Sequence, residues 1–129
     1  MVNRKYEFTD ETIEINGHTL HRIRSLIDIP ELCVKAGKLG GFIESEENLS
    51  HEGNCWIGDN AVVYDGSKVF GNAHVFENAK VYKNSTVCGN AKVFENAEVS
   101  HGSKVYGNAR VYGDTKVTSY SKVYKTIRV

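Results

Sequence analysis

Residues 71–99 read GNAHVFENAKVYKNSTVCGNAKVFENAEV, and a valine stands at every sixth position of this stretch. The period extends in both directions, because every sixth residue from 57 to 129 is Val or Ile. A small residue precedes each aliphatic by two positions, except at Cys55 and Ile127, and Asn, Gly or Asp follows it by three positions from Asn60 through Asp114. A six-residue period predicts a parallel β-solenoid.

The chemistry of the repeat explains this prediction. Side chains alternate across a strand, so the small residue and the aliphatic, such as Ala73 and Val75, face inward, while His74 and Phe76 face outward. Two residues then turn a corner, and the second, usually Asn or Gly, is expected to take the left-handed conformation. A period of six excludes a heptad coiled coil, and Asn or Gly in nearly every hexad disfavours a helix.

Three such sides close one coil of 18 residues, so that each residue stacks on the one 18 positions later. Residues 55–129 then form just over four coils, about 4.8 Å apart. The inward aliphatics are predicted to form three columns: Ile57, Val75, Val93, Val111 and Val129; Val63, Val81, Val99 and Val117; and Val69, Val87, Val105 and Val123.

The pattern resembles the hexapeptide repeat of left-handed parallel β-helix proteins. The stretches 39–43 (LGGFI) and 54–57 (NCWI), with the Asn-Ala-x-Val hexads after them, more narrowly resemble a group of bacterial and bacteriophage hexapeptide-repeat proteins. The resemblance implies an all-β, single-stranded left-handed parallel β-helix and suggests a bacteriophage origin. Many hexapeptide-repeat proteins are trimeric, acyl-CoA-dependent acyltransferases with a histidine general base. Their usual inserted loop or helical arm has no counterpart in the hexads of residues 55–129.

Residues 1–54 are expected to cap the solenoid, and the whole chain is expected to form one compact unit. Asn16-Gly17 predicts a hairpin that sets Ile13 opposite Leu20 and Ile15 opposite His18, packed on the open first coil. Pro30 predicts one or two helical turns ending at Gly37.

The entry to the repeat is expected to be irregular. Gly40-Gly41 predicts a tight turn, and residues 41–54 predict an entry coil with about two extra residues. Trp56, an outward residue of the first regular coil, is expected to lie under the hairpin.

Composition and charge exclude few classes of function. The net charge is zero, with an excess of acidic residues in 1–54 and of basic residues in 55–129. The chain has no apolar stretch of membrane-spanning length, no signal-peptide core, and three cysteines without metal-ligand spacing. A cytoplasmic location, no cofactor and no metal are expected.

The outward positions are unusual, because an aromatic residue often follows the aliphatic and a basic residue often precedes it. The predicted interaction surface consists of Phe70, Phe76, Tyr82, Phe94, Tyr106, Tyr112, Lys68, Lys92, Lys104 and Arg110. Three interpretations stay open: ladders that only stabilise the sheet, a surface for a second copy or another protein, and a platform for nucleic acid.

The C-terminal coil is expected either to fray or to be covered by another copy, through Val123, Tyr124, Ile127 and Val129. His74, His101 and His51 are the candidate catalytic residues, and solvated surface imidazoles are the alternative. We expect a non-enzymatic protein-interaction module that self-associates as a dimer or trimer. A phage-derived chain would bind or inhibit a host macromolecular complex. The alternatives are an acyltransferase and a nucleic-acid-binding protein.

Overall fold

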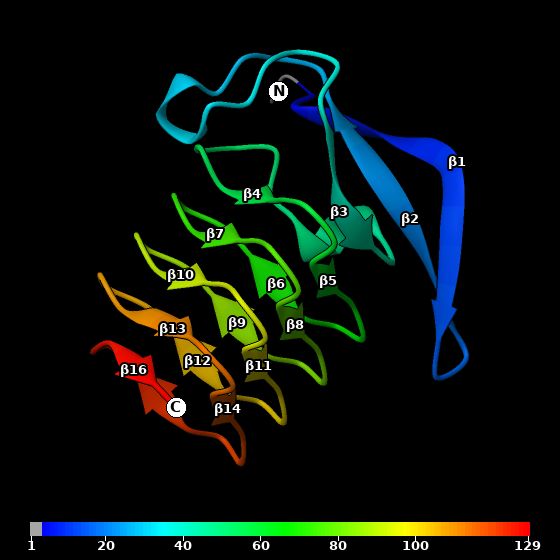
Figure 1. Ribbon diagram of the computed structural model, residues 1–129. Helices are drawn as coiled ribbons and strands as arrows, with labels where there is room; N and C mark the ends of the chain where they lie inside the picture. The colour runs from blue at the N-terminus through cyan, green and yellow to red at the C-terminus, as the bar shows by residue number, and fades with distance from the viewer. Residues whose placement is uncertain (1–3) are drawn as a thin grey trace.

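The computed structural model describes residues 4–129 and shows an all-β parallel solenoid of about five turns (Figure 1). Short strands repeat along it: β4 (Trp56–Ile57), β5 (Val62–Val63), β6 (Lys68–Val69), β7 (His74–Val75), β8 (Lys80–Val81), β9 (Thr86–Val87), β10 (Lys92–Val93), β11 (Glu98–Val99), β12 (Lys104–Val105), β13 (Arg110–Tyr112), β14 (Lys116–Val117), β15 (Lys122–Val123) and β16 (Ile127–Arg128). The fold class predicted from the hexads is confirmed.

The strands form three faces, which we name after their first regular strand. The β4 face has the order β16-β13-β10-β7-β4, the β6 face has the order β15-β12-β9-β6, and the β5 face continues into the N-terminal strands as β1-β2-β3-β5-β8-β11-β14. Within the regular coils, parallel partners are 18 residues apart, as in Val75 with Val93 and Val81 with Val99. The inward valines from Val63 to Val111 are at most 1% exposed, so they form one continuous core.

The entry coil is two residues longer than the others, as the sequence predicted. Strand β3 (Leu39–Ile43) pairs in parallel with β5, which places Ile43 beside Val63, and Leu49 forms a bridge with Val69. Both pairs are 20 residues apart. The two extra residues lie between Leu49 and Ile57, which are eight positions apart, since Ile57 pairs with Val75 at the regular distance of 18. Before Leu49, the short 3₁₀ turn η2 (Glu46–Asn48) forms the corner, and its buried Asn48 amide donates to Ser67 O at 2.8 Å.

The N-terminal hairpin covers the open edge of this coil. Strands β1 (Tyr6–Ile15) and β2 (His18–Ser25) pair in the predicted register, Ile13 with Leu20 and Ile15 with His18, and β2 pairs antiparallel with β3. Asn16 and Gly17 both have positive φ, 51° and 85°, as a tight hairpin turn requires. The hairpin runs beside the solenoid in Figure 1.

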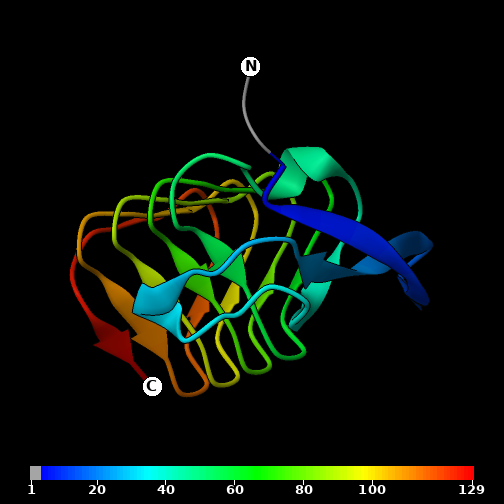
Figure 2. The same ribbon diagram turned by 90° about the horizontal axis from the view of Figure 1, so that it is seen from above.

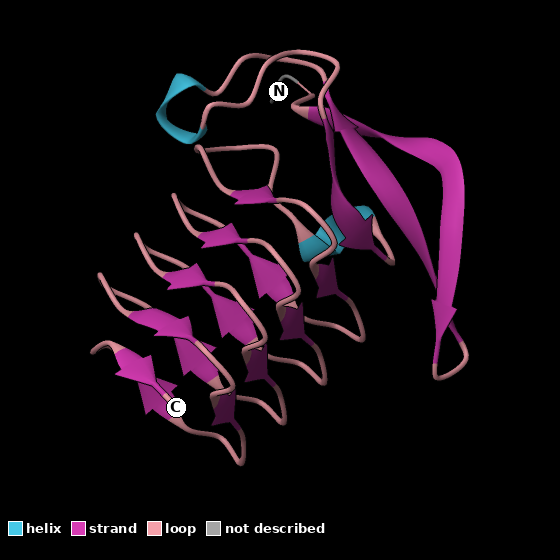
Figure 3. Cartoon of the chain, viewed as in Figure 1, coloured by secondary structure: helices cyan, strands magenta, loops and turns pink. Residues whose placement is uncertain are grey.

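The segment between β2 and β3 contains one helical turn that begins at Pro30 as predicted but ends at Leu32, well before Gly37. Only η1 (Pro30–Leu32) forms one 3₁₀ turn, because Cys33 takes the left-handed conformation and Val34 returns to form a bridge with Ile29. In Figure 2 this loop crosses in front of the coils, and Figure 3 shows η1 and η2 as the helical turns of the described chain.

The predicted turn at Gly40-Gly41 is wrong, because both glycines lie inside β3. A Cβ on Gly40 would lie 2.6 Å from Ile57 O and 2.6 Å from Trp56 Cζ2, and one on Gly41 would lie 2.5 Å from Ala61 O. The glycines therefore allow β3 to pack closely on the first regular coil. Trp56 is buried beneath the cap as predicted: its ring lies against Gly40 of β3, and Ile23 of β2 and Val34 of the loop belong to the same core cluster.

The corners also differ from the prediction. Between the β4 and β5 faces the left-handed residue is the first of the two corner residues, with φ near 58° at Glu77 and 57° at Glu95, and not the asparagine after it. The asparagine continues the hydrogen-bond ladder instead, since Asn78 N donates to Glu95 O at 3.0 Å.

The last coil breaks the period of 18. Val111 pairs with Ile127, so the predicted stacking of Val129 on Val111 is wrong. Only three residues separate Val123 from Ile127, and the Gly-Asn corner of the earlier coils is absent there. Ile127 packs against the core, whereas Val129 is 76% exposed.

Candidate functional site

The β4 face carries a ladder of stacked aromatic rings. Phe76, Phe94 and Tyr112 follow the inward valines of β7, β10 and β13, and their centroids are 4.9 Å apart with nearly parallel planes. His74 stacks on Phe76 at 4.2 Å. The rings are half-buried, so their edges form a continuous apolar strip along the face.

Charged residues of opposite sign flank this strip. Lys92 and Arg110 precede the inward valines, and the corner on the other side carries acidic residues, Glu77 and Glu95, in positions that the 18-residue stacking aligns. Glu77 N donates to Asp59 Oδ2 at 3.0 Å, which extends the acidic column by one coil. The β4 face therefore presents a basic column, an aromatic ladder and an acidic column, in this order along the strand direction.

The structure divides the predicted interaction surface among three faces. Phe76, Phe94, Tyr112, Lys92 and Arg110 lie together on the β4 face, whereas Phe70, Tyr106, Lys68 and Lys104 lie on the β6 face and Tyr82 lies on the β5 face. On the β6 face, the column from Phe70 to Tyr106 is interrupted by Cys88, which is 7% exposed.

Tyr82 belongs to a second, outer cluster beneath the hairpin. Its ring stacks on the buried Tyr64 at 5.5 Å, and its hydroxyl donates to Glu98 Oε1 at 3.0 Å. Burial, followed by the contact with Glu98, raises the pKa of Tyr82. Tyr82 therefore packs with the hairpin cluster and does not belong to the aromatic ladder.

The predicted C-terminal contact residues are similarly divided. Val123 faces inward and is 7% exposed, while Tyr124 is 57% exposed and half-buried Ile127 belongs to the last coil. Lys125 Nζ lies 5.6 Å from the Tyr124 ring centroid.

His51 is held in place by contacts with residues of the N-terminal cap. Its Nε2 lies 2.7 Å from Glu46 Oε1, its Nδ1 accepts from Lys5 N at 3.0 Å, and its ring stacks on Tyr6 at 4.1 Å. The hydrogen bond from His51 lowers the pKa of Glu46. Both ring nitrogens are occupied, so a general base at His51 would first have to lose one of these contacts.

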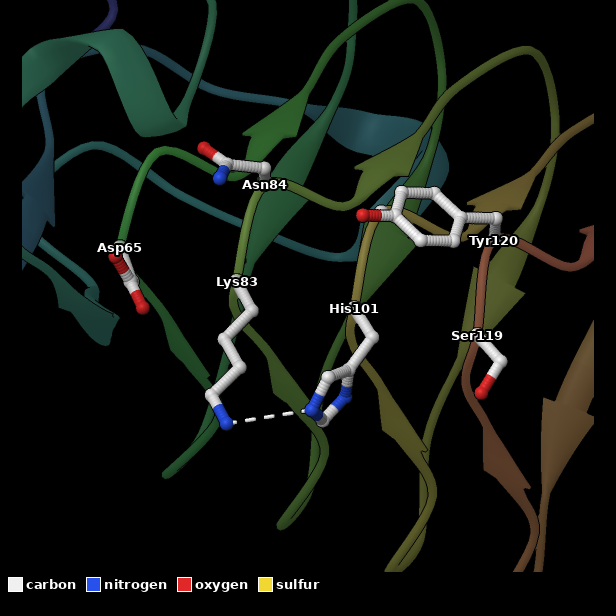
Figure 4. Close-up of a pocket in the computed structure, with 7 residues that line it drawn as sticks. Asp65, Lys83, Asn84, His101, Ser119 and Tyr120 are labelled. Carbon is white, nitrogen blue, oxygen red and sulfur yellow. Dashed lines mark hydrogen bonds between the residues drawn. The ribbon is translucent and has the colours of Figure 1, made fainter.

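His101 lines a polar hollow of about 410 Å³ at the corner between the β5 and β6 faces (Figure 4). Lys83 Nζ lies 3.3 Å from His101 Nε2, and Ser100 Oγ lies 2.8 Å from Nδ1. Both ring nitrogens of His101 therefore have a polar partner within the chain.

The corner that forms this hollow has several non-glycine residues in the left-handed backbone conformation. Lys83 and Asn84, and two coils later Ser119 and Tyr120, are consecutive non-glycine residues with φ between 54° and 61°. Such conformations cost of order 1 kcal/mol or more per residue. Figure 4 shows these side chains with Asp65 around the opening.

A histidine–carboxylate pair was missed by the sequence reasoning. His18 Nδ1 lies 2.7 Å from Glu44 Oε2, and Glu44 Oε1 accepts from Asp65 N at 2.9 Å. The shared hydrogen bond raises the pKa of His18 and lowers that of Glu44. The two residues are 26 positions apart and meet only because β2 pairs with β3, so no spacing rule could have found them.

Other site types lack a counterpart in residues 4–129. The three cysteines are free, and no group of three or more His, Cys, Asp or Glu side chains in this part of the chain is arranged around a metal position. Helices of the length and apolarity needed to cross a membrane do not occur among these residues.

The fold defines the chain as a parallel β-solenoid with a hairpin cap, consistent with a hexapeptide-repeat β-helix. In comparisons with known proteins, neither a protein-family model nor a curated protein sequence matches the chain.

Proposed function

We propose that the chain is a non-enzymatic protein-interaction module that self-associates through its β4 face. The order of the three columns on this face supports the proposal. The basic column (Lys92, Arg110) and the acidic column (Glu77, Glu95) lie on opposite sides of the ladder Phe76–Phe94–Tyr112.

This order is self-complementary under one two-fold axis. If two β4 faces meet about an axis parallel to the solenoid, the strand direction of one copy is reversed relative to the other. The basic column of each copy then faces the acidic column of its partner, and the two ladders meet at the centre. A two-fold axis along the strands would instead place like charges opposite each other, which is unfavourable. The charges therefore select a dimer with parallel solenoid axes.

A standard interface buries about 800 Å² per partner, so such a dimer would cover roughly an eighth of the 6836 Å² of accessible surface. Exposed apolar strips flanked by polar residues are typical of protein–protein contacts. The resemblance to hexapeptide-repeat proteins supports a left-handed winding and, for a phage-derived chain, a host complex as a further target. The three cysteines without metal-ligand spacing support a cytoplasmic location. These stay predictions.

Charge reversal tests the proposal. Glu95→Lys places a lysine in the acidic column and is expected to weaken the dimer at least tenfold, because Lys92 of the partner then meets a like charge. Lys92→Glu has the same expected effect, whereas the double variant Lys92→Glu/Glu95→Lys restores the opposite pairing and the dimer. Light scattering coupled to size-exclusion chromatography over a range of concentrations measures the mass.

Lys104→Glu on the β6 face is the matched control and is expected to leave the dimer unchanged. Circular dichroism verifies that each variant is folded. A native protein that stays monomeric at every concentration, or a double variant no better than the single ones, would overturn the proposal.

A further inference from the structure

The β6 face differs in chemistry from the β4 face, because the outward positions of its strands carry basic and aromatic residues and no carboxylate. The outward residues before the inward valines are Lys68, Thr86, Lys104 and Lys122, and those after them are Phe70, Cys88, Tyr106 and Tyr124. The acidic column of the β4 face therefore has no counterpart on these strands. Two β6 faces would repel each other, so this face is not suited to contact with a second copy.

The lysines of this face form one column along the solenoid. Lys104 pairs with Lys122 and with Thr86. Thr86 in turn pairs with Lys68. Neighbouring members of the column are one coil apart, which is about 4.8 Å, and the three lysines are exposed. A row of ammonium groups at this spacing attracts a partner whose negative charges repeat along a line.

The rings of this face are open to solvent, unlike those of the β4 ladder. Phe70 is 42% exposed, Tyr124 is 57% exposed, and Tyr120 at the adjoining corner is 79% exposed. Among residues 4–129, only these three Phe or Tyr side chains are exposed. Cys88 separates Phe70 from Tyr106, and the rings of Tyr106 and Tyr124 are tilted by 37° with centroids 5.9 Å apart. Stacking within the protein therefore leaves ring faces free.

The corner between the β5 and β6 faces extends this surface. The hollow in Figure 4 lies there, and Lys83, His101 and Tyr120 are among the residues that line it. Lys83 adds a fourth basic residue beside the lysine column. Asp65 also lines the hollow, and the four lysines outnumber this carboxylate. We call the whole patch the basic-aromatic surface; it consists of Lys68, Lys83, Lys104, Lys122, Phe70, Tyr120 and Tyr124.

We propose that the basic-aromatic surface binds single-stranded nucleic acid. The phosphates follow the lysine column along the solenoid, and unpaired bases stack on the free faces of Phe70, Tyr120 and Tyr124. Proteins that bind single strands combine a basic track with exposed aromatic rings in this way. A protein partner fits this surface less well, because lysine is depleted in protein–protein interfaces. A duplex also fits less well, because its bases are stacked on one another and leave no ring face free.

Fluorescence anisotropy with a labelled oligothymidylate of about 12 nucleotides tests the proposal, since single-strand sites span about 4–16 nucleotides. With four lysines on phosphates, the logarithm of the association constant is expected to fall with the logarithm of the salt concentration with a slope of about −3. A duplex of the same length is expected to bind at least fivefold more weakly. Polyglutamate at equal charge is expected not to compete. Absence of binding at low salt, or equal binding of the duplex or of polyglutamate, would overturn the proposal.

Ring and lysine variants separate stacking from charge. Phe70→Ala and Tyr124→Ala are each expected to weaken binding at least fivefold with an unchanged salt slope, because a base–aromatic contact is lost without a change of charge. Lys104→Met is expected to weaken binding and to reduce the salt slope by about 1. Lys80→Met on the β5 face is the matched control and is expected to change neither quantity. Circular dichroism verifies folding, and ring variants that keep the native affinity would sink the proposal.

The test of this surface is independent of the proposed dimer. Lys104→Glu is expected to lose oligothymidylate binding while the dimer stays unchanged. The double variant Lys92→Glu/Glu95→Lys alters the β4 face at constant net charge, and its affinity for oligothymidylate is expected to equal that of the native protein. Loss of binding in this double variant would place the site on the β4 face and contradict the proposal.

Discussion

At the scale of the residue, Lys5 shows how a buried charge holds the cap in place. It is 1% exposed, and its Nζ donates to Cys55 O at 2.6 Å and to Gly53 O at 3.2 Å, with Cys55 Sγ at 3.1 Å. Burial lowers the pKa of Lys5. The ammonium thereby joins the start of β1 to the corner that precedes β4.

Lys5→Met is expected to destabilise the protein by roughly 1–3 kcal/mol, because the two carbonyl groups lose their buried donor. Urea denaturation measures the change. The exposed Lys80→Met is the control and is expected to stay within about 0.5 kcal/mol of the native protein. Equal stability of the two variants would contradict the structural role of Lys5.

His74 predicts a dependence of stability on pH. Its pKa is lowered from 6.5 to about 4, by burial first and then by Lys92, while Asp59 opposes the shift and Lys38 adds to it. Between these two values the unfolded chain binds more protons than the folded one. His74 therefore contributes full stability above about pH 6.5, and this contribution falls as the pH drops towards 4.

The expected loss is on the order of 3 kcal/mol by pH 4. His74→Gln removes the titrating group, so its stability relative to the native protein is expected to improve as the pH falls from 6.5 to 4. Urea denaturation at several pH values measures the difference, with His101→Gln as the control. Parallel curves for His74→Gln and the native protein would rule out this role of His74.

At the scale of the element, the last coil shows how a strand can leave the repeat. Strand β16 pairs with β13 through Val111 and Ile127, two residues out of the hexad register. Val129 N donates to Thr115 Oγ1 at 2.8 Å, and Val129 O accepts from Asp114 N at 2.7 Å. Backbone contacts therefore hold Val129, whereas Ile127 contributes its side chain to the core.

Aspartate substitutions at Ile127 and Val129 distinguish the observed register of the last coil from an uninterrupted hexad register. Ile127→Asp is expected to cost about 1–3 kcal/mol, since it places a carboxylate against apolar surface. Val129→Asp is expected to change stability by about 0.5 kcal/mol or less, as exposed substitutions do. Thermal unfolding of the two variants measures the difference. A Val129→Asp variant less stable than Ile127→Asp would contradict the observed register and support the uninterrupted hexad register.

At the scale of the whole molecule, the three faces have different environments. The hairpin and an outer apolar cluster cover the start of the β5 face, and the N-terminal loop covers the start of the β4 face around Trp56. Further along the β4 face, the aromatic ladder lies between columns of opposite charge.

The amino-acid sequence by itself determined the solenoid, the columns of inward valines, the hairpin register and the length of the entry coil. These features depend on local rules: alternation along a strand, a six-residue period, and the backbone preferences of Asn-Gly. The stacking of Phe76 on Phe94 followed from the same period, because a repeat places equivalent residues one above the other.

Only the tertiary structure decided the rest. The 18-residue stacking already separated the ladder Phe76–Phe94–Tyr112 from the column of Phe70 and Tyr106, but only the structure shows that Tyr82 joins the hairpin cluster. The pairs His18–Glu44 and Lys5–Cys55, and the loop over Trp56, depend on where the cap folds back on the solenoid. No period relates the cap to the coils, so these contacts arise from packing between segments far apart in the chain. The register of Ile127 was decided in the same way, by which aliphatic side chain fills the last layer of the core.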